Sequence, residues 1–134
     1  MARLSIAQMR AHILQLSTGH NIRIEWRRDR DGAWAARSLN LISIPRIRSA
    51  ISYAIALHEI GHLLGPGQRA SRMRCERGAW RWAKTNAIAW LASMNKTERR
   101  SLAWCECNAR RAKAVGKKPA GKRRGDSAQC ARTH

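Results

Sequence analysis

The sequence contains no phenylalanine and a single tyrosine, so its six tryptophans supply nearly all of the large aromatic volume. Acidic residues are also scarce: eight Asp and Glu stand against 27 Lys and Arg, which gives a formal net charge of +19. This imbalance favours acidic partners, such as nucleic acid or an anionic protein surface, without distinguishing between them.

Long apolar runs are absent as well. No stretch reaches the roughly 20 apolar residues that a membrane-spanning helix requires. The first 20 residues carry charges and histidines throughout, unlike a secretion signal with its separate apolar core. We therefore expect a soluble, cytoplasmic protein. Its 134 residues, 44% of them hydrophobic, fit one small domain.

The four cysteines lack the C-x-x-C spacing of zinc knuckles and thioredoxin-like sites. Cys105 and Cys107 form only a C-x-C pair, which is a weak metal signal. Without an export signal we expect reduced thiols that behave as small buried or surface residues.

Local signals predict an α+β fold that is mainly helical. Ser5 and Gln8 form a capping-box pattern at the start of a helix that ends near Gly19. Between residues 21 and 45 apolar and polar residues alternate, and the pair Asp31-Gly32 is typical of a hairpin turn. We therefore expect a small antiparallel sheet in this region, closed by the proline at position 45.

Three further helices are expected after the sheet. Ser49 is predicted to cap a helix over residues 50–64, which ends at the Gly-Pro-Gly sequence that follows. A second helix is predicted over residues 72–94, and a third, basic helix from Asn95 onwards. Residues 116–134 are rich in Gly, Lys and Arg and have no apolar periodicity, so we expect a basic flexible tail after a single domain spanning residues 1–115.

The stretch ALHEIGHLLG, residues 56–65, carries the most specific chemistry. On a helix His58 and His62 lie one turn apart and within about 40° of each other, so both imidazoles can face one metal ion. Glu59, on the adjacent flank, can serve as the base that deprotonates a zinc-activated water. The alternative is a pair of ordinary core or surface histidines, but two histidines on an apolar helix are costly to bury without partners. The sequence thus predicts Zn²⁺ binding, and Gly61 predicts that another backbone packs closely there.

A catalytic zinc usually takes three protein ligands, and three candidates for the third follow the motif. Gln68 stands where the metzincin signature needs a histidine, and an amide is a poor zinc ligand. Glu76 begins an otherwise apolar stripe, where a carboxylate needs a partner such as zinc, although a nearby arginine or a solvent-exposed helix start would also explain it. Cys75 is the next candidate for the third ligand after Glu76. The predicted stripe consists of Met73, Glu76, Trp80, Ala83, Ala87 and Trp90.

The combination of YAIALHEIGHLLG with the following CERGAWRWA resembles the ImmA/IrrE family of small gluzincin-type metallopeptidases, many of them encoded on phages and mobile elements. The resemblance covers roughly residues 22–91, including the small sheet. It implies that His58, His62 and Glu76 bind zinc and that Glu59 is the general base. It also implies that the protein cuts, or enables the cutting of, a repressor or regulatory protein. The only tyrosine, Tyr53, precedes the motif by more than a helical turn, so the sequence assigns no transition-state stabiliser.

A second hypothesis is a nucleic-acid-binding accessory protein with a structural or vestigial zinc site. Tryptophans can stack on bases, and the tail can hold polyanions without sequence preference, although it can also serve only solubility. We expect Trp80 and Trp90 in the core, since tryptophans at helical spacing usually fill it. Trp82, off the stripe, is the best candidate for a surface contact.

Overall fold

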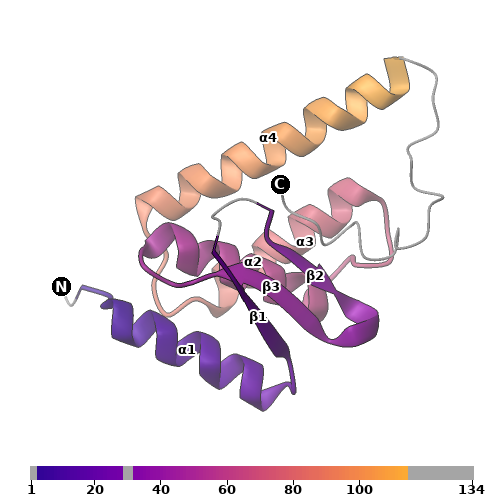
Figure 1. The fold of residues 1–134 in the computed structure, drawn as a ribbon. Helices are drawn as coiled ribbons and strands as arrows, with labels where there is room; N and C mark the ends of the chain where they lie inside the picture. The colour runs from indigo at the N-terminus through magenta and orange to yellow at the C-terminus, as the bar shows by residue number, and fades with distance from the viewer. Residues whose placement is uncertain (1–2, 29–31, 115–134) are drawn as a thin grey trace.

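The computed structural model describes residues 3–28 and 32–114 (Figure 1). The predicted basic tail, residues 116–134, lies outside the described residues. The elements are α1 (Ile6–Gly19), β1 (Arg23–Arg27), β2 (Trp34–Ala36), the 3-10 turn η1 (Arg37–Leu39), β3 (Leu41–Pro45), α2 (Ala50–Leu64), α3 (Arg72–Asn86) and α4 (Ala92–Ala114). The predicted α+β class, mainly helical and with a small sheet ahead of the motif helix, is confirmed.

Helix α2, which carries the motif, lies at the centre of the molecule. It contacts α1, α3 and α4 as well as strands β2 and β3. Figure 1 shows α1 beside the sheet at the bottom of the view and α4 crossing the top. None of the helices within residues 3–28 and 32–114 combines the length and apolarity needed to cross a bilayer.

The sheet is mixed, which corrects the expectation of a purely antiparallel one. Its strand order is β1-β3-β2, with β1 parallel and β2 antiparallel to the central strand. Gly32 has a φ of +81°, as a turn residue would, yet the two strands that flank it are not partners. The reason is burial: all five residues of β3 are buried, so this strand takes the middle position where both of its edges are paired.

The predicted helix starts at Ser5 and Ser49 are confirmed. Ser5 accepts a hydrogen bond from the Gln8 amide, and the Gln8 side chain accepts one from the Ser5 amide in return. Ser49 and Ser52 form the same reciprocal box at the start of α2. Gly65 ends α2, with its N–H bonded to the Gly61 carbonyl oxygen.

The helix expected over residues 72–94 is two helices in the structure. α3 ends at Asn86, and α4 begins at Ala92, before the predicted start at Asn95. The buried hydroxyl of Tyr53 accepts a hydrogen bond from the Ile88 amide at 3.1 Å, so a distant side chain satisfies a backbone group in the break. That hydroxyl also lies 2.6 Å from His12 Nδ1, which ties α1 to the same point.

The tryptophans divide between core and surface. Trp80 is buried, as predicted, and Trp90 is half-buried against the core although it lies beyond the end of α3. Trp82 is also half-buried against the core, so it is not the surface tryptophan that the sequence suggested. Trp26 and Trp104 are the exposed ones, at 41% and 43%.

Glycines allow α3 to approach both α2 and the loop that follows α2 closely. A Cβ atom on Gly61 would overlap the Ala79 carbonyl oxygen and lie 2.9 Å from its Cα. A Cβ on Gly78 would overlap the Pro66 carbonyl oxygen. The close backbone packing predicted at Gly61 is therefore present, and it sets the distance between the two helices.

Substituting Gly61 with alanine tests this contact. Because the neighbour is backbone and cannot rotate away, we expect Gly61→Ala to lower the free energy of unfolding by about 2 kcal/mol or more, despite the higher helix propensity of alanine. Gly19→Ala is the matched control, since a Cβ there meets nothing within 4 Å. Chemical denaturation followed by circular dichroism measures both. Equal stability of the two variants would contradict the close contact.

Candidate metal centre

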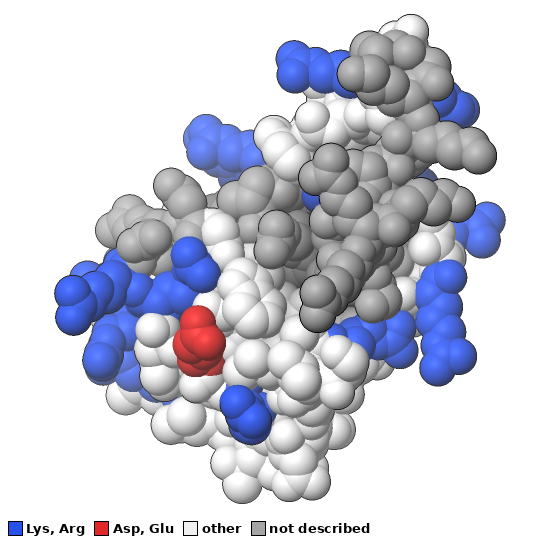
Figure 2. Space-filling model, turned by 45° about the vertical axis from the view of Figure 1, so that its right-hand side comes forward, with Lys and Arg blue, Asp and Glu red and all other residues white. Residues whose placement is uncertain are grey.

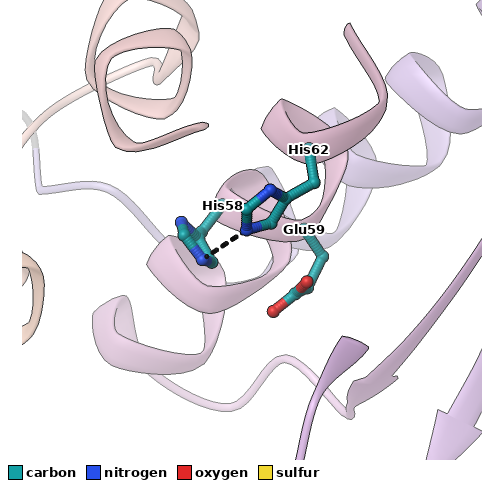
Figure 3. Close-up of side chains that lie close together, drawn as sticks. All are labelled: His58, Glu59 and His62. Carbon is teal, nitrogen blue, oxygen red and sulfur yellow. Dashed lines mark hydrogen bonds between the residues drawn. The ribbon is translucent and has the colours of Figure 1, made fainter. Parts of the chain in front are cut away.

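Four buried polar side chains meet between α2 and α3. His58, Glu59 and His62 come from α2, and Glu76 comes from α3; none of them is more than 1% exposed. His58, Glu59 and His62 each offer a ligand atom within 4.8 Å of the others (Figure 3). The structure thus brings together His58, Glu59, His62 and Glu76, and the group of the two histidines and Glu59 can hold a metal ion.

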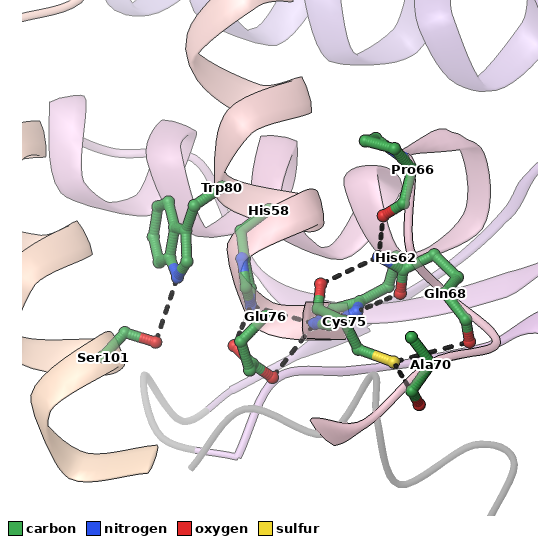
Figure 4. Close-up of polar contacts among 9 residues, drawn as sticks. All are labelled: His58, His62, Pro66, Gln68, Ala70, Cys75, Glu76, Trp80 and Ser101. Atoms are coloured by element: carbon green, nitrogen blue, oxygen red, sulfur yellow. Dashed lines mark hydrogen bonds and ion pairs between the residues drawn. The ribbon is translucent and has the colours of Figure 1, made fainter. Parts of the chain in front are cut away.

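The two imidazoles and the Glu76 carboxylate form a compact triangle (Figure 4). His58 Nε2 lies 3.1 Å from His62 Nε2 and 3.1 Å from Glu76 Oε2, and His62 Nε2 lies 3.2 Å from Glu76 Oε1. Tetrahedral zinc with bonds of about 2.0 Å separates its ligand atoms by about 3.3 Å. The three donors therefore fit one zinc ion with little movement.

Both glutamates are near enough to the histidines to be considered as the third ligand. Glu59 belongs to the 4.8 Å group, whereas the Glu76 oxygens approach the imidazole nitrogens to 3.1 and 3.2 Å. The shorter distances match the edge of a tetrahedral site, so the geometry favours Glu76 as ligand. Glu59 then remains beside the site as a second carboxylate, at a distance that a water molecule can bridge.

Glu76 is held in its ionised form. Burial is the largest single influence on its pKa and raises it. The charge of His58 and the contacts with both imidazoles together outweigh burial, and they lower the pKa to about 2. At neutral pH the carboxylate is thus deprotonated, which is the form that a metal ligand must have.

Gln68 fixes the orientation of His62. The Gln68 amide nitrogen donates to the carbonyl oxygens of Pro66 and Cys75 at 3.0 and 2.8 Å, so this nitrogen must face the loop. The Gln68 Oε1 atom then faces His62 Nδ1 at 2.8 Å, and because that oxygen can only accept, Nδ1 carries the proton. The Nε2 atom of His62 is therefore the nitrogen that faces Glu76 and His58 and would bind a metal there.

Cys75, the other candidate ligand, faces a different direction. Its sulfur lies 3.4 Å from the Gln68 carbonyl oxygen and 3.6 Å from that of Ala70. Figure 4 shows the sulfur directed towards the loop, while the neighbouring Glu76 side chain points at the histidines. The thiol thus contributes to the packing of the loop between α2 and α3.

The supporting roles of two residues, Gln68 and Trp80, did not emerge from the sequence. Gln68 was considered only as a ligand, although a polar residue in the loop after the second histidine is well placed to contact that histidine. Trp80 stacks on His58 with ring centres 4.2 Å apart and an interplanar angle of 26°. The Trp80 Nε1 atom donates a hydrogen bond to Ser101 Oγ of α4 at 3.1 Å. The indole ring is therefore held by His58 against its face and by Ser101 at its nitrogen.

No protein-family model matches the chain, and no curated protein or solved structure matches it either. The resemblance to the ImmA/IrrE family therefore stays a prediction that rests on the motif residues.

The choice between Glu76 and Cys75 can be tested by metal analysis. We expect about one zinc per wild-type chain and a large loss of zinc in Glu76→Gln, because an amide of the same shape is a poor ligand. Cys75→Ala should retain zinc, since its sulfur faces the loop. Elemental analysis with a chelator competition assay measures both, and circular dichroism checks that each variant is folded. Zinc retained in Glu76→Gln and lost in Cys75→Ala would reverse the assignment.

The support given by Gln68 predicts a second effect. Gln68→Met keeps the volume but removes the acceptor for His62 Nδ1, and we expect it to weaken zinc binding about 10- to 100-fold while one zinc can still be bound. Gln15→Met, at an exposed position of α1, should bind zinc like the wild type. Unchanged affinity in a folded Gln68→Met variant would show that His62 is oriented without the amide.

Proposed function

We propose that the protein is a zinc-dependent metallopeptidase in which His58, His62 and Glu76 bind the metal and Glu59 is the general base. The observation that carries this proposal is the set of contacts of 3.1 to 3.2 Å that joins two imidazole nitrogens to each other and each of them to one oxygen of the Glu76 carboxylate, with a further buried carboxylate beside it. Two imidazoles and one carboxylate suit zinc, whereas calcium and magnesium prefer oxygen ligands alone.

The number of ligands supports a catalytic site over a structural one. Structural zinc sites are closed by four protein ligands, often cysteines, whereas catalytic sites use three and leave one position for water or substrate. Within the described residues, both cysteine-based alternatives are poorly placed: Cys75 faces the loop, and Cys105 and Cys107 lie on α4. A His, His, Glu set with an additional Glu adjacent to the first histidine is an arrangement that can catalyse hydrolysis.

In this reaction zinc would lower the pKa of a water molecule from about 15.7 towards 7 and polarise the scissile carbonyl. Glu59 would accept the proton from the attacking water and deliver it to the leaving nitrogen. Its burial within α2 fixes its position relative to both histidines. Gln68 would keep His62 in the binding tautomer, and Trp80 would hold the ring of His58.

The substrate in this proposal is a peptide bond in a protein. The resemblance to the ImmA/IrrE family points to a repressor or regulatory protein, and the small number of acidic residues makes an acidic substrate surface electrostatically favourable. Both features define which candidate proteins to examine first.

The role of Glu59 is tested by comparing Glu59→Gln with wild type. The zinc-loaded proteins are incubated with a proteome-derived peptide library, and cleavage is followed by mass spectrometry. We expect Glu59→Gln to keep its zinc and to cleave the best substrate about 10²- to 10⁴-fold more slowly, because the amide cannot accept the proton. Glu106→Gln, on the exposed face of α4, is the matched control and should cleave normally.

Two results would contradict the proposal. Normal cleavage by a zinc-loaded Glu59→Gln variant would remove Glu59 from the mechanism. An absence of any cleavage by zinc-loaded wild type, over the whole library and with denatured proteins added, would reject peptidase activity while leaving metal binding intact.

A further inference from the structure

Helix α4 carries a line of basic residues around an exposed tryptophan. With a rotation of 100° per residue, these side chains fall within an arc of about 80° along the outer face of the helix. We call this set the α4 stripe. It consists of Lys96, Arg100, Trp104, Cys107 and Arg111, all of them exposed.

The charge of the α4 stripe is not neutralised by the acidic residues of the same helix. Glu98 lies on another side of α4 and pairs with Lys84 of α3 at 2.9 Å. Glu106 pairs with Arg110 at 2.8 Å, also off the stripe. The three stripe cations therefore face solvent in a straight row about 22 Å long. In Figure 2, Lys and Arg are spread over the visible face, whereas acidic side chains form one small patch.

Trp104 sets this row apart from an ordinary solvated face. The inner side of α4 is packed by Met94 and Cys105, both buried, while Trp104 remains 43% exposed. The guanidinium carbon of Arg72, at the start of α3, lies 5.9 Å from the centre of the indole ring. A large exposed aromatic ring thus has cations both along its own helix and from the neighbouring one.

We propose that the α4 stripe, together with Arg72, is a binding surface for single-stranded nucleic acid. Lys96, Arg100 and Arg111 would contact successive phosphates, and an unpaired base would stack on Trp104. Basic tracks with an exposed aromatic ring are how proteins bind single strands without sequence preference, since every base has a stacking face. A duplex offers no free base face, and an acidic protein would need the charges but not the tryptophan.

The surface lies outside the metal centre, so the proposal is independent of peptidase activity. One link to that centre is the hydrogen bond from Trp80 to Ser101, a residue on the inner side of α4. Binding by the α4 stripe would therefore be a second function of the chain.

The high net charge requires a test that separates this surface from general attraction. The probe is a fluorescently labelled oligothymidylate of about 20 nucleotides, titrated with the full chain in about 0.1 M salt and followed by anisotropy. The stripe variant combines Lys96→Ala, Arg100→Ala and Arg111→Ala. The control variant removes the same charge from exposed positions in and after β1 and after β3, away from α4. It combines Arg23→Ala, Arg28→Ala and Arg46→Ala.

We expect the stripe variant to bind at least about tenfold more weakly, with the slope of log Kd against log salt reduced by about 2, since each phosphate contact on a single strand contributes about 0.7. The control variant should change Kd by less than about threefold. Trp104→Ala should weaken binding about tenfold, because one stacked base contributes 1 to 3 kcal/mol, and Trp104→Phe should restore most of the loss. Glu59→Gln should bind like the wild type.

Three results would overturn the proposal. Equal weakening in the stripe and control variants would mean that only overall charge attracts the strand. Unchanged binding by Trp104→Ala would remove the stacking contact. Binding of a labelled polyglutamate peptide as tightly as oligothymidylate, with the same dependence on the stripe cations and none on Trp104, would assign the surface to an acidic protein partner.

Discussion

The backbone contact between α2 and α3 is the constraint on which the candidate site depends. The HEIGH sequence supplies two imidazoles and a glutamate from one helix, but the third donor of the triangle comes from the next helix. The distance between the axes of two packed helices depends on the size of the side chains at their contact. Glycine at position 61, facing Ala79, lets the helices come close enough for the carboxylate of Glu76 to reach both histidines.

The interior of the site is polar where the rest of the core is apolar, and this has an energetic consequence. Burying charged or hydrogen-bonding groups is unfavourable unless each has a partner. His62 meets this requirement through Gln68 on one nitrogen and Glu76 on the other, and Gln68 in turn satisfies two loop carbonyl oxygens. The loop between the two helices is therefore more than a connection, because it determines which imidazole nitrogen can bind a metal.

The sequence predicted features that depend on residues close together in the chain and missed those that depend on residues far apart. The capping box at Ser5, the N-cap at Ser49 and the spacing of His58 and His62 are local, so they could be read directly. Pairing of β1 with β3 is non-local, and the Asp-Gly turn signal suggested the wrong neighbour. The break after Asn86 has neither glycine nor proline to mark it in the sequence. The freed Ile88 amide is satisfied by Tyr53, which lies 35 positions earlier and therefore gives no local signal. The importance of Gln68 likewise appears only when the loop is folded back onto α2.

Trp80 has a consequence for communication within the fold. Its indole ring stacks on His58, meets Trp90 edge to face at 6.4 Å and donates a hydrogen bond to Ser101 of α4, so one rigid side chain joins an imidazole of the candidate metal centre to helix α4. A ligand that displaced α4 would act on the orientation of His58 through this ring. Thermodynamic linkage makes such an influence reciprocal: metal bound at the candidate centre would change the affinity of α4 for such a ligand by the same factor.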